Sequence, residues 1–168
     1  MTATYDVIVI GLGAMGSATA YHLAKRGVRV LGIDQYEPPH DMGSSHGESR
    51  IIRQLYYEHP LYVPLVQRSF ELWRALERDA GMSDLLRMTG GLMIGSESSG
   101  LIKGVRRSAR EHRLPLEDIP GHLLQERFPQ FIPMAGFSAV LDPEAGYLRS
   151  EEHTSELQSR VDISYAVF

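Results

Sequence analysis

The stretch 7-VIVIGLGAMG-16 decides the fold of this 168-residue chain. Its four apolar residues predict a strand, and the glycines after them predict a tight turn that leads into a helix. Gly11 permits a turn that a Cβ would obstruct, Gly13 lets backbone N–H groups approach a pyrophosphate, and Gly16 lets the helix pack closely on the strand. The positive end of the helix then faces the phosphates. The stretch therefore predicts a dinucleotide site.

An acidic residue supports this prediction. Residues 30–33, VLGI, predict a second strand, which delivers Asp34 near the spacing of about 20 residues expected for an acid bonded to the ribose hydroxyls. An acid here argues against a 2′-phosphate and hence against NADP. NAD and FAD stay open, because both present the same ADP half to the turn. The predicted fold class is α/β, opening with a Rossmann-like unit.

A second motif, 43-GSSHGESRIIR-53, is predicted to form a loop that enters an apolar strand. Its small residues let the backbone approach a flat ligand, and Arg50 and Arg53 bring fixed positive charge to that ligand. Two plainer interpretations stay open. Arginines that flank an Ile-Ile pair are often strand-end residues in solvent, and His46 suits a hydrogen-bonded loop histidine.

With these two motifs, residues 4–148 resemble the family of monomeric sarcosine oxidase, N-methyl-tryptophan oxidase and pipecolate oxidase, which are FAD-dependent oxidoreductases of the DAO type. The resemblance implies three candidate catalytic residues: Arg50 against the flavin, Arg53 on the substrate carboxylate, and His46. It implies that His46 and Arg50 also bind FAD, together with Gly11, Gly13, Ala14, Met15, Gly16, Asp34, Gly43, Ser44 and Ser49.

Chemistry agrees with these implied roles. Removing hydride from a carbon next to nitrogen leaves negative charge on the reduced flavin, which a fixed cation such as Arg50 stabilises. A planar guanidinium such as that of Arg53 suits bidentate capture of a carboxylate. The resemblance thus implies an oxidase of N-methyl or cyclic amino acids that passes hydride to FAD, with O₂ as acceptor and an imine and H₂O₂ as products. The alternatives are an NAD-dependent dehydrogenase, which leaves the second motif without a role, and a non-functional fragment.

The resemblance also implies the domain organisation: a GR2-type FAD-binding unit over residues 1–87 and the beginning of an interleaved substrate domain over residues 88–148. Apolar spacing predicts a helix over 62–80, with Trp73 as a core anchor. Further predictions are a strand over 88–95, a helix capped by Ser98 and running to about 112, a short helix over 120–128 and a strand over 136–141.

Residues 149–168 are predicted to be a non-native tail without a domain. Their two segments 150-SEEHTSELQS-159 and 163-ISYAVF-168 resemble the in-frame translation of a common high-throughput sequencing adapter. The first has almost nothing apolar to bury. We therefore expect a truncated chain, an inactive and aggregating fragment, and a tail that lies as a detached helix or coil.

Composition excludes several other functions. A formal net charge of −4 gives no basic surface for nucleic acid. The chain has no cysteine, so a covalent flavin thioether cannot form on it, and its seven histidines show no metal-ligand spacing. The sequence has no run of about 18 apolar residues, so no membrane-spanning helix is predicted. We expect a cytoplasmic protein whose partners are a small amino-acid substrate and O₂.

Overall fold

The computed structural model describes residues 4–37, 40, 42–44, 47–132, 134–149 and 164–167. The chain divides into two compact units. Unit 1 comprises residues 1–50, 78–85 and 149–168, and unit 2 comprises residues 51–77 and 86–148. The domain boundary expected at residue 88 stays a prediction. His46 and most of the adapter-like tail lie outside the described residues.

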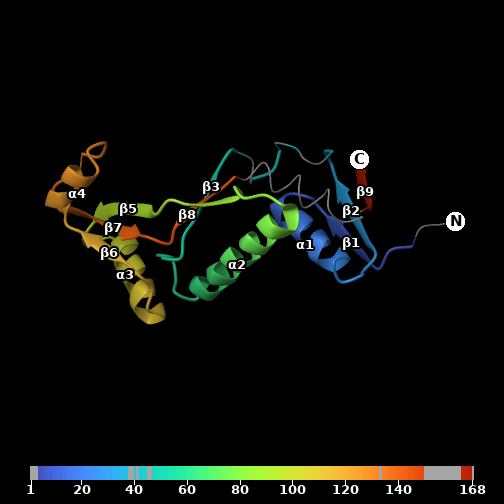
Figure 1. The fold of residues 1–168 in the computed structure, drawn as a ribbon, viewed down its shortest axis with the longest axis horizontal. Helices are drawn as coiled ribbons and strands as arrows, with labels where there is room; N and C mark the ends of the chain where they lie inside the picture. The colour runs from blue at the N-terminus through green and yellow to red at the C-terminus, as the bar shows by residue number, and fades with distance from the viewer. Residues whose placement is uncertain are drawn as a thin grey trace. The chain divides into compact units, whose positions relative to one another are not determined.

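Unit 1 contains the βαβ arrangement that the glycine-rich stretch predicts. Strand β1 (Val7–Ile10) leads into helix α1 (Ala14–Ala24), and strand β2 (Val30–Asp34) runs parallel to β1 (Figure 1). The register pairs Val7 with Val30 and Ile10 with Ile33. Leu12, Ala20 and Val30 are buried together, so the turn, the helix and the second strand share one small core.

The end of the chain also joins this sheet. Strand β9 (Ser164–Val167) lies parallel to β2 on the edge away from β1, with Leu31 opposite Ser164. The expectation of a detached helix or coil is therefore wrong for these residues. The free edge of a strand presents unpaired backbone N–H and C=O groups, and an extended apolar segment can pair with them whatever its origin.

Unit 2 contains an antiparallel sheet of order β5-β7-β6, formed by β5 (Gly91–Ser96), β7 (Phe137–Asp142) and β6 (Glu117–Ile119). Helices α3 (Gly100–His112) and α4 (Gly121–Arg127) pack against it. Two apolar clusters hold these elements together. One contains Leu55, Ile102, Val105, Ala109 and Val140, and the other contains Ile119, Leu124 and Ala139.

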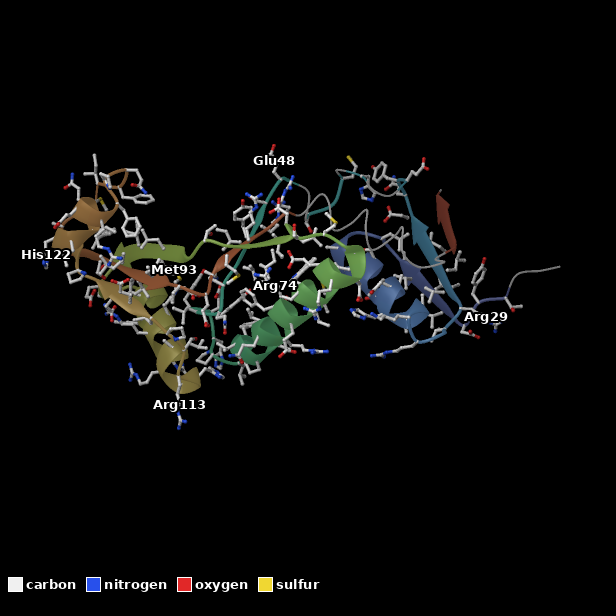
Figure 2. All side chains as sticks on the ribbon, in the orientation of Figure 1. Arg29, Glu48, Arg74, Met93, Arg113 and His122 are labelled. Atoms are coloured by element: carbon white, nitrogen blue, oxygen red, sulfur yellow. The ribbon has the colours of Figure 1, made fainter. Side chains whose placement is uncertain are left out.

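A second sheet, of order β3-β8-β4, consists of three short strands: β3 (Arg50–Ile52), β8 (Gly146–Leu148) and β4 (Leu86–Met88). Its apolar side chains pack with those of helix α2 (Tyr62–Ala80), and Trp73 lies against this cluster as a core anchor, as predicted. Glu77 ties the helix to β4, because its carboxylate accepts the Leu86 N–H at 3.1 Å and pairs with Arg74 at 2.7 Å. Figure 2 shows Arg74 on α2.

The strand predicted over residues 88–95 is in fact two strands, β4 and β5. The chain turns between them at Gly90, whose φ is +74°, and the N–H groups of Thr89 and Gly90 both donate to the Ala145 carbonyl. A left-handed residue with this bonding ends one strand before the next begins. The short strands β6 and β8 were not predicted.

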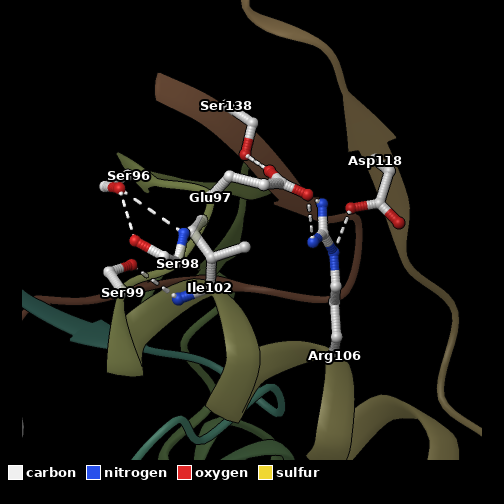
Figure 3. A network of polar contacts seen from close by, with 8 residues as sticks. All are labelled: Ser96, Glu97, Ser98, Ser99, Ile102, Arg106, Asp118 and Ser138. Carbon is white, nitrogen blue, oxygen red and sulfur yellow. Dashed lines mark hydrogen bonds and ion pairs between the residues drawn. The ribbon is translucent and has the colours of Figure 1, made fainter. Parts of the chain in front are cut away.

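A polar network joins α3 to the β5-β7-β6 sheet (Figure 3). Arg106 of α3 donates to Glu97 at 2.6 Å and to Asp118 of β6 at 2.7 Å. Ser138 of β7 donates to the other oxygen of Glu97. Hydrogen bonds from Arg106 and Ser138 lower the pKa of the Glu97 carboxyl. One guanidinium thus joins the helix to two separate parts of the sheet.

The N-terminus of α3 differs by one residue from the prediction. The Ser99 hydroxyl, and not that of Ser98, accepts the Ile102 N–H at 3.2 Å. We expect Ser99→Ala to lower the free energy of unfolding by about 0.5–2 kcal/mol, measured by urea denaturation, because the helix loses its cap. Ser98→Ala is the matched control and should change stability far less, since its hydroxyl contacts Ser96 instead. Equal losses in the two variants would contradict this assignment.

Candidate dinucleotide site

The glycine turn adopts the conformation that close helix packing requires. Gly11 has a φ of +86°, and its N–H donates to the Ile33 carbonyl at 2.7 Å. A Cβ added at Gly16 would lie 1.7 Å from the Gly11 carbonyl oxygen. A side chain at position 16 would therefore separate α1 from the turn, while a side chain at position 11 would strain the backbone.

The start of α1 is open where an anion would bind. Gly13 occupies the N-cap position without a side-chain cap, and a Cβ added there would meet no atom of the described chain within 4 Å. The Met15 side chain points into solvent, and the Ser17 hydroxyl donates back to the Gly13 carbonyl at 2.8 Å. Uncapped N–H groups at a helix N-terminus suit a phosphate, so this turn fits the diphosphate of a dinucleotide.

Asp34 joins the turn to the end of β2. One oxygen of its carboxylate accepts the Leu12 N–H, and the other accepts the Tyr36 N–H at 3.1 Å. Burial alone would raise the pKa of Asp34, but the hydrogen bonds from Leu12, Tyr36 and Gln35 outweigh it and lower the pKa. Asp34 is therefore ionised and fixes the turn. Its role in binding ribose stays a prediction.

Sequence reasoning did not anticipate the histidine beside this acid. His40 Nε2 lies 3.3 Å from Asp34 Oδ1, which is within ion-pair distance. The two atoms do not form a hydrogen bond, and Nε2 is buried with no hydrogen-bond partner among the described residues. The nearby imidazole contributes to the lowered pKa of Asp34.

The loop of the second motif folds around Arg50. The guanidinium donates to the carbonyls of Ser49 at 2.8 Å and Ser44 at 3.5 Å. Gly47, with a φ of +122°, lies so close that a Cβ there would be 2.8 Å from an Arg50 nitrogen. The structure thus brings Ser44, Ser49 and Arg50 together, while the predicted role of His46 falls outside the described residues.

Arg53 lies in unit 2 and has a different environment. One guanidinium nitrogen contacts both carboxylate oxygens of Glu58, at 3.0 and 3.2 Å. The guanidinium carbon lies 4.9 Å from the ring centre of Tyr56 and 5.4 Å from that of Tyr57. These three residues follow Arg53 closely in the sequence, yet sequence reasoning missed them because an isolated Tyr-Tyr-Glu has no distinctive spacing. Arg53 therefore holds a carboxylate and lies within cation–π distance of two aromatic rings.

The parallel βαβ unit, its open glycine turn and the acid after its second strand define a dinucleotide-binding protein of the Rossmann-like class. The chain belongs to the FAD dependent oxidoreductase family (DAO), whose sequence model matches residues 6–162. This family uses FAD, so the comparison favours FAD over the NAD alternative. Within the residues that the structure describes, no helix is long and apolar enough to cross a membrane.

Two curated relatives show the same affiliation. The chain is 47% identical over 151 residues to a monomeric sarcosine oxidase of Streptomyces avermitilis, covering 90% of this chain and 39% of the relative. It is 42% identical over 147 residues to an N-methyl-L-tryptophan oxidase of Yersinia pestis, covering 88% and 39%. The chain thus spans about two fifths of the length of these relatives.

A solved structure supports the fold. It is the open form of NikD, an unusual amino acid oxidase essential for nikkomycin biosynthesis. The match has a TM-score of 0.85 and 25% sequence identity, and it covers 99% of this chain and 44% of NikD.

Two of the three glycines of the turn, Gly13 and Gly16, allow binding and folding to be tested separately. Gly13→Ala should leave the thermal unfolding temperature nearly unchanged, because the added Cβ meets open space. It should weaken FAD binding by about tenfold or more, since forcing a methyl group into a tight contact costs about 1–3 kcal/mol. Gly16→Ala should lose both stability and binding. FAD titration by fluorescence and thermal unfolding measure the two effects, and normal FAD affinity in Gly13→Ala would contradict the predicted site.

Proposed function

We propose that the complete protein is an FAD-dependent oxidase of secondary amino acids that carry an N-methyl group or a ring nitrogen. The observation that carries this proposal is the Arg53 guanidinium, which holds a carboxylate in a chain of the FAD dependent oxidoreductase family. The names of the two curated relatives, sarcosine oxidase and N-methyl-L-tryptophan oxidase, support the same substrate class.

The residues of unit 1 have distinct tasks in this proposal. The turn from Gly11 to Gly16 holds the diphosphate, and Asp34 keeps that turn in place. Ser44, Ser49 and Gly43, together with His46, line the flavin side. When bound, FAD would supply the acceptor for a hydride from the substrate carbon next to nitrogen and would pass the two electrons to O₂, giving H₂O₂. Arg50 supplies positive charge near the group that becomes negative.

Arg53 binds and orients the substrate. Its fork of N–H donors matches a carboxylate, and the rings of Tyr56 and Tyr57 lie within cation–π distance of its charge. Because Glu58 holds the guanidinium in this structure, the substrate carboxylate has to displace an internal one. The substrate then loses its hydride and the proton on nitrogen, so that a carbon–nitrogen double bond forms.

The exposed face of β1 supports a longer parent protein. Ile8 is 57% exposed and Ile10 is 85% exposed, although strands of parallel sheets are normally covered on both faces. We propose that further segments of the complete protein, outside these 168 residues, cover this face of β1. The 168-residue chain alone would then be inactive as an oxidase and prone to aggregate. We also propose that the complete protein is cytoplasmic.

Completing the gene tests the proposed reaction. The purified product should be yellow, and its flavin absorbance should bleach when sarcosine or pipecolate is added without O₂. Admitting O₂ should restore the colour and release H₂O₂, which a peroxidase assay detects. A colourless protein that binds NADH would overturn the proposal, and a flavin bleached only by amines without a carboxylate would overturn the role of Arg53.

Two substitutions around Arg53 should act in opposite directions in the complete enzyme. Arg53→Ala should raise KM for the amino acid, because it removes about 2–5 kcal/mol of substrate-binding free energy if the ion pair with the substrate is buried. Glu58→Gln should lower KM, because it removes the competing carboxylate while keeping a side chain of similar size. Steady-state kinetics measures both. An unchanged KM in Arg53→Ala would remove this residue from the substrate site.

A further inference from the structure

Asp142 is a buried carboxylate at the end of β7 and contacts the segment directly after Arg53. Its side chain is 1% exposed. One oxygen accepts the N–H groups of Gln54 at 3.0 Å and Leu55 at 3.1 Å. The other accepts the Glu144 N–H at 3.0 Å. Burying a charge is unfavourable unless hydrogen bonds compensate it, and two of these three donors, Gln54 and Leu55, belong to the segment that Asp142 thereby holds.

The same segment is also held by α3. The Ser108 hydroxyl donates to the Tyr56 carbonyl. Gly104 allows the helix to approach so closely that an added Cβ would lie 2.1 Å from the Tyr57 carbonyl oxygen. The Leu55 side chain is fully buried between these anchors. Residues 54–57 are therefore fixed at consecutive backbone groups by α3 and by the end of β7, which are distant in sequence.

Arg53 depends on this fixed segment for its own surroundings. The two rings near its guanidinium belong to Tyr56 and Tyr57, and its ion-pair partner Glu58 follows immediately. A shift of residues 54–57 would move Arg53 together with its rings and its partner. An Asp at position 142 is thus suited to set the position of a guanidinium that it does not touch.

We propose that Asp142 is a positioning residue for Arg53. Asp142 and Ser108 of α3 together hold residues 54–57, and we call these contacts the clamp. This inference rests on the proposed function, in which Arg53 binds the substrate carboxylate. Asparagine at position 142 keeps the shape of the side chain but turns one oxygen into an N–H donor. That donor would face either the N–H groups of Gln54 and Leu55 or the N–H group of Glu144, so one set of bonds is lost.

Hydrogen exchange tests the clamp without reference to substrate. In the complete, FAD-loaded protein, the amides of Gln54 and Leu55 should exchange slowly. They should exchange much faster in Asp142→Asn. Asp118→Asn is the matched control, because it makes the same change of charge in unit 2 at a residue bound to Arg106. Unchanged exchange in Asp142→Asn would overturn the clamp.

Kinetics tests the positioning role. Asp142→Asn should raise KM for the amino acid roughly tenfold, below the ~100-fold that a misplacement of 1 Å can cause, while FAD content stays at the wild-type level. In an Arg53→Ala background, the same substitution should raise KM no further, because its effect passes through Arg53. An equal rise in KM in both backgrounds would overturn the proposal, as would an unchanged KM in Asp142→Asn alone.

Two further results keep the outcomes distinct. If Asp142→Asn does not fold, Ser108→Ala replaces it, and it should raise KM severalfold with the same dependence on Arg53. An unchanged KM in Arg53→Ala itself would overturn the proposed role of Arg53 and with it this positioning role. The exchange rates of Gln54 and Leu55 then still report whether the clamp exists, so the two failures can be told apart.

Discussion

The hydrogen bond from the Leu12 N–H to the Asp34 carboxylate is the interaction on which unit 1 depends. It joins the glycine turn to the end of β2, so the start of α1 and the end of the second strand form one rigid corner. This corner requires glycine at position 16, because a side chain there would separate α1 from the Gly11 carbonyl. The open space beside Gly13 then lies at a fixed helix end, which is the condition for binding a phosphate by backbone groups.

The same device recurs in unit 2. Glu77 accepts the Leu86 N–H and Asp142 accepts those of Gln54 and Leu55, so buried carboxylates hold backbone amides at points where distant segments meet. A backbone N–H is a donor that substitution does not remove, except by proline. A carboxylate aimed at it therefore fixes the course of the chain whatever side chain the partner carries. Each carboxylate needs this compensation, because an unpaired buried charge would destabilise the unit.

Sequence reasoning succeeded where a pattern is local. The glycine turn, the two strands around α1 and the long helix with Trp73 follow from periodicity within short windows. It failed where contacts are distant. The bond between Asp142 and Gln54 joins residues 88 apart, and the pairing of β8 with β4 joins residues 58 to 62 apart. Ser98 and Ser99 offer the same hydroxyl to the helix, and only the backbone geometry decides between them. The edge pairing of β9 shows the same limit, because any extended segment can occupy a free strand edge.

The two arginines of one motif illustrate how surroundings decide chemistry. Arg50 donates to the carbonyls of Ser44 and Ser49, which are dipoles and leave its positive charge uncompensated by these contacts. Such a cation suits a position where negative charge develops during a reaction. Arg53 instead holds the Glu58 carboxylate, so its charge is already matched. A matched guanidinium adds little to a developing charge, but it can exchange one carboxylate for another. Three positions of sequence thus separate a residue suited to stabilising charge from a residue suited to recognising substrate.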